Sequence, residues 1–372
     1  MSFIPSQLPV GKDPRTSVLI WCGIVSLFAF AAVEWLGPAD VGVDRIAATQ
    51  AVQKMQQATD VVRAAFREKG LRFDDVIDPN HTGLVGDEYT ELTTTLGSLE
   101  AKRTTTNPAM AGLMVQLLKE AGVRAGDTIA VGCSGSFPAM AIAVLAASEA
   151  LKVTPLMIAS LGSSSYGATR TDMTLLDILK ILDSAKVINH LPLAATLGGA
   201  DDVGNEFEAE VRQLLIDKIK HSGVPFLFES DLQQNVARRL QIYFGSTGSR
   251  RIAAFVNIGG NYADLGTSPL ILKLEPGVNR TLQIPEAKET HGVVFAMANR
   301  HIPLVHVLHI KGLAVKYGIP WDPVPLPKIE GVVHARARLG LVSPAGAVIV
   351  LYVIALIVIL VRYRRAFYRT PS

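Results

Sequence analysis

The chain has 372 residues, of which 49% are hydrophobic and 19% are charged, and its formal net charge is +3. The positive charge lies at the ends, because residues 1–15 carry +1 and residues 362–372 carry +4, which leaves −2 for the middle. A slightly acidic middle without a stripe of Lys and Arg predicts no nucleic-acid partner. The two cysteines, Cys22 and Cys133, provide neither a disulfide within the middle of the chain nor a cysteine metal site.

Two long uncharged runs stand near the ends of the chain, at residues 16–33 and 339–361. A helix of about 20 apolar residues crosses the roughly 30 Å hydrocarbon core of a bilayer. We therefore predict a transmembrane helix at 16–35 that acts as a signal anchor, and a second one at 341–361. The alternative for the first run is a cleaved signal peptide, since residues 29–31 (Ala-Phe-Ala) resemble a cleavage site.

The Lys and Arg residues beside these runs predict the orientation. Lys12 and Arg15 precede the first run, and four arginines follow the second, against Arg336 and Arg338 on its other side. The positive-inside rule then places both termini in the cytoplasm and the middle outside it, in a two-pass protein of the cell (inner) membrane. The predicted segments between and beyond the spans are a cytoplasmic tail (1–15), a stalk-like helix (36–76), an extracytoplasmic α/β domain (77–328), a juxtamembrane linker (329–340) and a basic cytoplasmic tail (362–372).

Short apolar runs alternate with helical patterns through the middle of the chain. The predicted strands are 127–132, 154–161, 191–197, 225–228, 252–258 and 301–309. The predicted helices are 40–70, 108–122, 138–151, 172–182, 206–221 and 232–244, with another that ends at Tyr317. Near-continuous apolar strands are typical of parallel sheets covered on both faces. We therefore predict an α/β fold with a mostly parallel sheet and helices on both faces, flanked by the two transmembrane helices.

Four loops rich in Gly and Ser follow predicted strands, at residues 132–138, 162–167, 198–204 and 257–262. The carboxyl ends of parallel strands meet at one edge of a sheet, where open α/β folds bind their ligands. Backbone amides of such loops and Ser hydroxyls suit phosphate or carboxylate. The alternative is that Gly and Ser only form tight turns and cap helices. The ligand-binding residues predicted from these loops are Ser134, Gly135, Ser136, Gly162, Ser163, Gly198, Gly199, Asn257, Gly259 and Gly260.

None of the four loops matches a P-loop or a G-x-G-x-x-G fingerprint, so we expect no nucleotide and no other cofactor. No metal site is expected from His301, His306 and His309 either. The apolar residues between His301 and His309 predict a strand, which puts the imidazoles of His306 and His309 on opposite faces.

The first loop also resembles a nucleophile elbow, although Ser136 replaces the last glycine of that pattern. Under this alternative Ser134 is the nucleophile of a serine hydrolase. His301, His306 and His309, with Asp231 and Asp264, are the later residues that would complete a triad. Cys133 is a further candidate nucleophile, or only a small packed side chain.

A polar block from 93 to 107 has no clean helical or strand period. Glu100, Lys102 and Arg103 lie in it between two threonine triplets. One interpretation is a solvated, capped helix. The other is a clamp in which Lys102 and Arg103 bind carboxylates of a ligand.

These stretches together resemble the poly-γ-glutamate system protein family. The resemblance is carried, in chain order, by residues 78–80 with 82–83, 93–108, 134–139, 160–162, 198–199 with Asp202 and Gly204, 257–260, and 317–320 with 322–325. Where the resemblance leads us to expect a third glycine after Gly260, this chain has Asn261. It implies a membrane component of poly-γ-glutamate synthesis or export, and it brings no catalytic residue.

Three hypotheses follow. The first is an accessory protein whose extracytoplasmic domain binds the carboxylates of the polymer, or binds the synthetase. The second is a serine-type hydrolase or transferase that acts on the polymer through Ser134. The third is a structural subunit whose two spans pack against the integral membrane subunits of the synthesis and export machinery. All three share the lipid bilayer as a partner.

Overall fold

The computed structural model describes residues 14–36, 44–248, 250–280, 292–327 and 344–368. They form two compact units, one from the middle of the chain and one from its two ends. Each unit is described by itself below.

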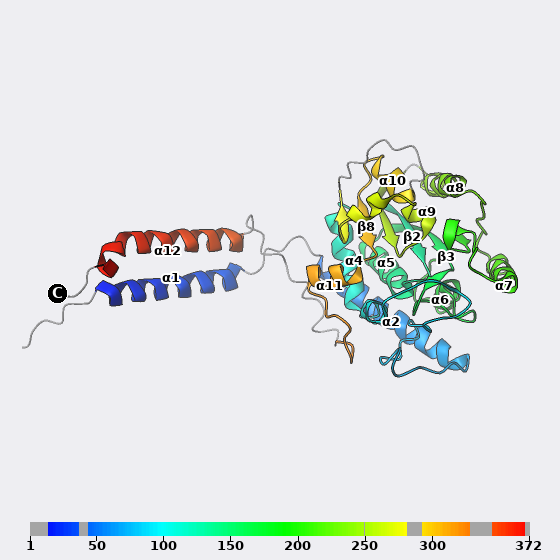
Figure 1. Cartoon of the computed structure of the whole chain (residues 1–372), viewed down its shortest axis with the longest axis horizontal. Coiled ribbons are helices and arrows are strands. Elements are labelled where there is room, and N and C mark those ends of the chain that lie inside the picture. The colour runs from blue at the N-terminus through cyan, green and yellow to red at the C-terminus, as the bar shows by residue number, and fades with distance from the viewer. Residues whose placement is uncertain (1–13, 37–43, 249, 281–291, 328–343, 369–372) are drawn as a thin grey trace, which may run out of the picture. The chain divides into compact units, whose positions relative to one another are not determined.

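A six-stranded sheet with the order β5-β3-β2-β6-β8-β7 is the centre of the middle unit (Figure 1). All neighbouring strands are parallel except β7, which runs antiparallel to β8 at one edge. The strands are β2 (Thr128–Ser134), β3 (Thr154–Ser160), β5 (Ala194–Thr196), β6 (Ile252–Ile258), β7 (Gly277–Asn279) and β8 (Leu304–Val307). The predicted α/β fold with a mostly parallel sheet is confirmed.

Helices cover both faces of this sheet because alternate residues of each strand point to opposite sides. Val131 and Cys133 of β2 pack on one side, where α2, α4, α5, α6 and α11 contribute apolar residues. Ala130 of β2 and Phe255 of β6 pack on the other side, against α8, α9 and α10. The helices are α2 (Arg45–Glu68), α4 (Ala109–Glu120), α5 (Pro138–Leu151), α6 (Leu175–Ser184), α7 (Ala209–Lys220), α8 (Leu232–Gly245), α9 (Tyr262–Leu265), α10 (Val293–Ala298) and α11 (Ile310–Tyr317).

Helix α2 is not the stalk predicted for residues 36–76. Its apolar stripe, which includes Ala51, Met55 and Val62, is fully buried against α4 and α5. An apolar stripe needs a partner, and here the partner lies within the domain rather than in solvent or in the membrane. The α/β unit therefore includes α2 and begins before residue 77, which is the start that the sequence predicts.

A second, two-stranded sheet joins the polar block to one of the Gly/Ser loops. Strand β1 (Thr93–Thr95) pairs in parallel with β4 (Ser163–Ser164). The short helix α3 (Leu99–Thr105) follows, capped by the side chain of Ser98, which accepts the amide of Ala101. This pairing places α3 beside the carboxyl edge of the main sheet.

Several short elements escaped the sequence patterns. Strand β7, helices α9 and α10, and the 3-10 turns η1 (Ala200–Asp202) and η2 (Pro269–Lys273) have between three and six residues each, too few to show a period. The strand predicted at 225–228 is reduced to one bridge between Phe226 and Ala195.

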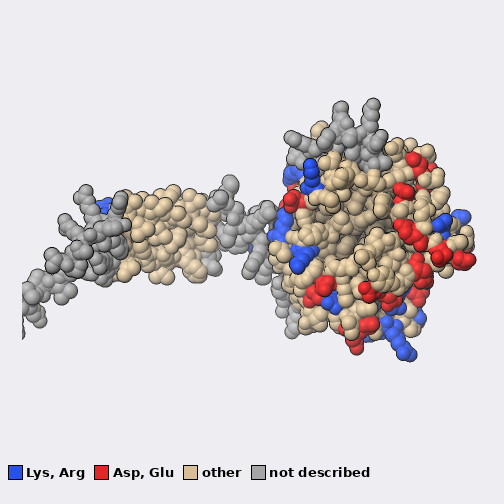
Figure 2. Space-filling model, viewed as in Figure 1, with Lys and Arg blue, Asp and Glu red and all other residues tan. Residues whose placement is uncertain are grey.

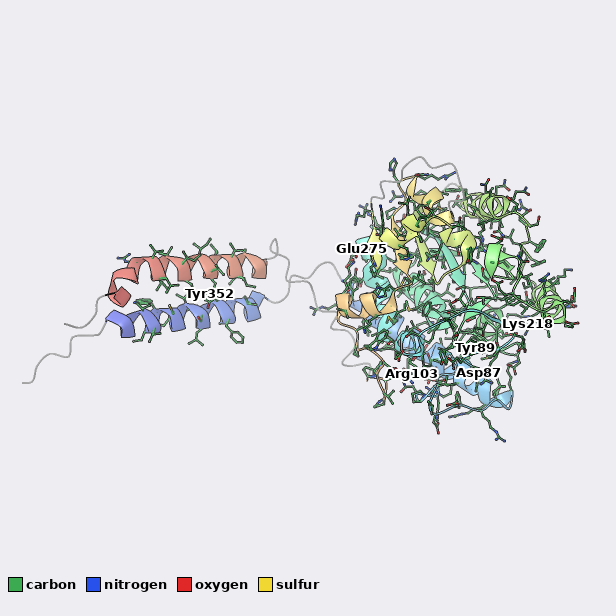
Figure 3. All side chains as sticks on the ribbon, viewed as in Figure 1. Asp87, Tyr89, Arg103, Lys218, Glu275 and Tyr352 are labelled. Carbon is green, nitrogen blue, oxygen red and sulfur yellow. The ribbon has the colours of Figure 1, made fainter. Side chains whose placement is uncertain are left out.

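The unit formed by the two ends of the chain is an antiparallel pair of helices, α1 (Pro14–Leu36) and α12 (Pro344–Tyr368) (Figure 1). The hydroxyls of Ser26 and Tyr352 lie 3.0 Å apart between them (Figure 3). Large apolar side chains such as Leu27, Phe28 and Val361 are about 70% exposed on this pair.

These two helices overlap the spans predicted at 16–35 and 341–361. Within the described ranges, no helix has both the length and the apolar character needed to cross a membrane. The predicted linker at 329–340 and most of the N-terminal tail lie outside the described residues, as does the end of the C-terminal tail.

Candidate functional site

A cavity of about 610 Å³ opens at the carboxyl edge of the main sheet. All four Gly/Ser loops line it, as parallel strands require, because the loops that follow neighbouring strands emerge on the same side. Their lining residues are Ser134, Ser136, Phe137, Gly162, Ser164, Gly198, Gly199, Gly260, Asn261 and Tyr262. On the face of the domain in Figure 2, charged side chains lie mostly toward the periphery and uncharged residues fill a hollowed centre.

Glycine is needed where two of these loops touch. Gly198 has a φ of +84°, and a Cβ built on it would lie 2.8 Å from the amide nitrogen of Gly162. A side chain there would meet both a strained backbone and a backbone clash. Gly260 differs, since nothing lies within 4 Å of a Cβ at that position. The rim of the cavity is therefore close-packed at one glycine and open at another.

Lys102 reaches into this cavity from α3, although only 2% of its surface is exposed. Its Nζ lies 2.7 Å from the Ser164 hydroxyl and donates to the carbonyl oxygen of Ser136. The amine also lies 4.0 Å from the centroid of the Phe137 ring. Burial lowers the pKa of Lys102 to about 7, because little water is left to solvate the charged form.

Arg103 does not join Lys102 in the cavity, so the predicted two-residue clamp is wrong. Its guanidinium forms a forked ion pair with Asp322, with Nε 2.6 Å from Oδ1. It also donates to the carbonyl oxygen of Val76. Consecutive residues of a helix point in different directions, so two adjacent cations seldom face the same ligand.

Four other predicted ligand residues lie behind the rim and hold its shape. The amide of Gly135 donates to the carbonyl oxygens of Ser160 and Gly162. The Asn257 side chain donates to the carbonyl oxygen of Gly259, which has a φ of +86°. Ser163 is buried, and its hydroxyl donates to the carbonyl oxygen of Ser164.

Ser134 lines the cavity, but the predicted triad partners do not meet it. Its hydroxyl accepts the amide of Ser136 at 3.4 Å, and no basic side chain of the described residues hydrogen-bonds to it. Asp231 caps α8 instead, and His306 lies 3.3 Å from Asn257. His301 sits in a turn with a φ of +57°.

The remaining candidates for nucleophilic chemistry make no hydrogen bond to Ser134 within the part of the chain that the structure describes. Cys133 is fully buried, which raises the pKa of its thiol and leaves it a packed side chain. His309 lines the cavity at the start of α11. Within the described ranges, no group of three or more His, Cys, Asp or Glu side chains has a metal-binding arrangement.

A buried ionic network beneath the rim escaped the sequence analysis. Arg239 has no exposed surface, and its guanidinium lies 2.6 Å from Asp202 and 3.3 Å from Asp264. Asp202 in turn accepts the side-chain amide of Asn261 at 2.9 Å, and Asn261 also donates to the Ser160 hydroxyl. Asn261 and Ser160 line the cavity, so the network positions part of its wall.

Burial raises the pKa of Asp264 to about 6, because desolvation outweighs the attraction of Arg239. One feature of the sequence does indicate this ionic network. Arg239 falls four residues from both Asn235 and Tyr243, within the stripe of α8 that faces the sheet. An arginine at the centre of a buried stripe implies buried carboxylate partners.

Comparison with known proteins adds no relative to this description: no family model, no curated protein and no solved structure matches the chain.

Proposed function

We propose that the protein is a membrane-anchored accessory component of poly-γ-glutamate biosynthesis or export, whose middle unit binds the carboxylates of the polymer in the cavity. The observation that carries this proposal is the convergence of four Gly/Ser loops and the buried Lys102 on one cavity. The resemblance of the sequence to the poly-γ-glutamate system protein family supplies the identity of the polymer.

The chemistry of the cavity suits a flexible polyanion that must be released. Amides of Gly199 and Gly260 find no acceptor among the described residues, so they are available to a ligand. Lys102 adds a charge-assisted hydrogen bond when protonated. Glu100 and Glu206 also line the cavity and oppose tight binding of an anion. A volume of about 610 Å³ falls within the usual range for small-molecule sites and accommodates a short stretch of the chain.

The helix pair from the two ends of the chain is proposed to anchor the protein in the bilayer. The uncharged runs at 16–33 and 339–361 and the exposed apolar side chains of α1 and α12 support this assignment. The same surface would contact integral membrane subunits of the synthesis and export machinery.

Binding of fluorescently labelled poly-γ-glutamate to the full-length protein in detergent tests the proposal. We expect Lys102→Met to weaken binding about tenfold or more at pH 6, because a charge-assisted hydrogen bond contributes roughly 1.5–3 kcal/mol. Gly260→Trp should fill part of the cavity, since a Cβ at this position meets no atom within 4 Å. Lys186→Met, which changes a 73% exposed lysine outside the cavity, is the matched control. Equal affinity for all four proteins would contradict the proposal.

A further inference from the structure

We infer that Ser164 and Lys102 form a nucleophile–base pair that gives the cavity an acyl-transfer activity toward an amide or ester carbonyl. This activity goes beyond binding, and it differs from the hydrolase predicted from the sequence, in which Ser134 was the nucleophile. It rests on the proposed function only for the identity of the natural substrate.

The geometry of the pair fits such a role. Lys102 Nζ lies 2.7 Å from Ser164 Oγ, within the reach that a general base needs to remove a hydroxyl proton. Ser164 is half-buried and lines the cavity, whereas Lys102 lies deeper. A substrate that enters the cavity therefore meets the hydroxyl first, while the amine behind it is shielded from bulk solvent.

Contacts with Ser136 and Phe137 fix both members of the pair. The carbonyl oxygen of Ser136 and the Phe137 ring orient the amine. The amide of Ser164 donates to the hydroxyl of Ser136 at 3.0 Å. Such a third group, which orients the base, belongs to the general pattern of activated nucleophiles.

Gly97 permits the close approach of the two side chains. A Cβ at this position would lie 3.2 Å from both Lys102 Cε and Ser164 Oγ, and 2.5 Å from the carbonyl oxygen of Ser165. The pairing of β1 with β4 brings this glycine to the site, since Thr95 lies opposite Ser164.

The protonation state of the lysine is compatible with a base near neutral pH. Burial brings the pKa of Lys102 to about 7, so an uncharged amine with a free lone pair is well populated there. Its neighbours in hydrogen-bond reach are a carbonyl oxygen and a hydroxyl. The other ionisable groups that line the described cavity are Glu100 on α3, Glu206, Tyr262, His309 and Lys311.

The reaction balances with these two side chains and water. Ser164 Oγ attacks the carbonyl carbon while Lys102 Nζ takes the hydroxyl proton. The tetrahedral intermediate collapses, the C–N or C–O bond of the substrate breaks, and Lys102 passes the proton to the leaving group. Water then attacks the Ser164 ester, Lys102 takes a proton from that water and returns it to Oγ, and a carboxylic acid leaves. An amine in place of this water would give transfer instead of hydrolysis.

A fluorophosphonate probe, incubated with the full-length protein and followed by peptide mass mapping, tests the inference. We expect an adduct on Ser164 that forms faster as the pH rises through about 7. Ser164→Ala should abolish the adduct, and Lys102→Met should slow it at least about 100-fold. Ser184→Ala, an exposed serine outside the cavity, is the matched control. A melting temperature close to that of the wild type shows that each variant is folded.

Lys102→Arg separates catalysis from binding, because arginine keeps the positive charge but does not act as a base. We expect this variant to bind poly-γ-glutamate and to lose the adduct. If Ser164 remains unlabelled from pH 6 to 9, or if the adduct forms on Ser134, the inference is overturned while polymer binding stands on its own measurement. If Ser164 is labelled but the polymer neither binds nor shortens, the pair is upheld and the polymer proposal fails.

Discussion

At the scale of single residues, Lys102 is a buried amine that also lines the cavity. An amine that is 2% exposed loses the hydration of its charged form, which disfavours protonation in the folded state. The ordinary lysine pKa of 10.5 applies to the unfolded chain, while the folded value is about 7. Between these values the unfolded chain binds a proton that the folded protein lacks.

This difference predicts how stability depends on pH. The free energy of unfolding of the wild type should rise with pH between about 7 and 10.5, relative to Lys102→Met. The slope is at most about 1.4 kcal/mol per pH unit, the value for one proton. Below pH 7 the cost of burying the charge is fully present, so Lys102→Met should be the more stable protein there. Urea unfolding of both proteins at pH 6, 7, 8 and 9 measures the difference, and parallel curves would contradict the assignment.

At the scale of elements, Arg239 joins helix α8 to the segments that carry Asp202 and Asp264. We predict that Arg239→Ala costs about 3–5 kcal/mol of stability, because it leaves two carboxylates buried without a counter-charge. The adjacent Arg238 is exposed and hydrogen-bonds to Gln241, so Arg238→Ala should change stability by less than about 0.5 kcal/mol. Urea unfolding at pH 7.5 measures both, and equal losses would show that the network contributes nothing.

Contacts between distant elements, such as those of this network, could not be predicted from the sequence. The bounds of β6 were predicted correctly, because an apolar run is a local feature of the sequence. The four loops were predicted to share one edge, because the carboxyl ends of parallel strands always lie on the same side of a sheet. The partner of an amphipathic stripe is not a local property. For that reason α2 was predicted as a stalk although it packs in the core.

The direction of side chains on short helices and strands could not be predicted from the sequence pattern either. Lys102 and Arg103 are adjacent, and only their places on α3 decide that one enters the cavity and the other pairs with Asp322. Ser164 was missed for a similar reason. Its value as a site residue comes from the contact with Lys102, which is 62 positions away in the chain.

At the scale of the whole molecule, the distribution of charge and apolar surface divides the chain. Residues 1–15 and 362–372 carry +5 together, whereas the middle carries −2. The helices next to these tails expose Leu27, Phe28 and Leu351, whereas most apolar residues of the middle unit are buried around the sheet. Under the positive-inside rule this charge division is the basis for our proposal that the cavity lies outside the cytoplasm, where an exported polymer would meet it.

Cysteine labelling in intact cells tests that topology. We predict that a membrane-impermeant maleimide labels Lys220→Cys, at the exposed end of α7, without cell lysis. The wild type serves as the background, because Cys133 is fully buried and Cys22 lies within α1. A cysteine added after Ser372 should react only after lysis, since the arginine-rich tail is predicted to stay in the cytoplasm. The opposite pattern would reverse the orientation, and a mature N-terminus near Ala32 would replace the first anchor with a cleaved signal peptide.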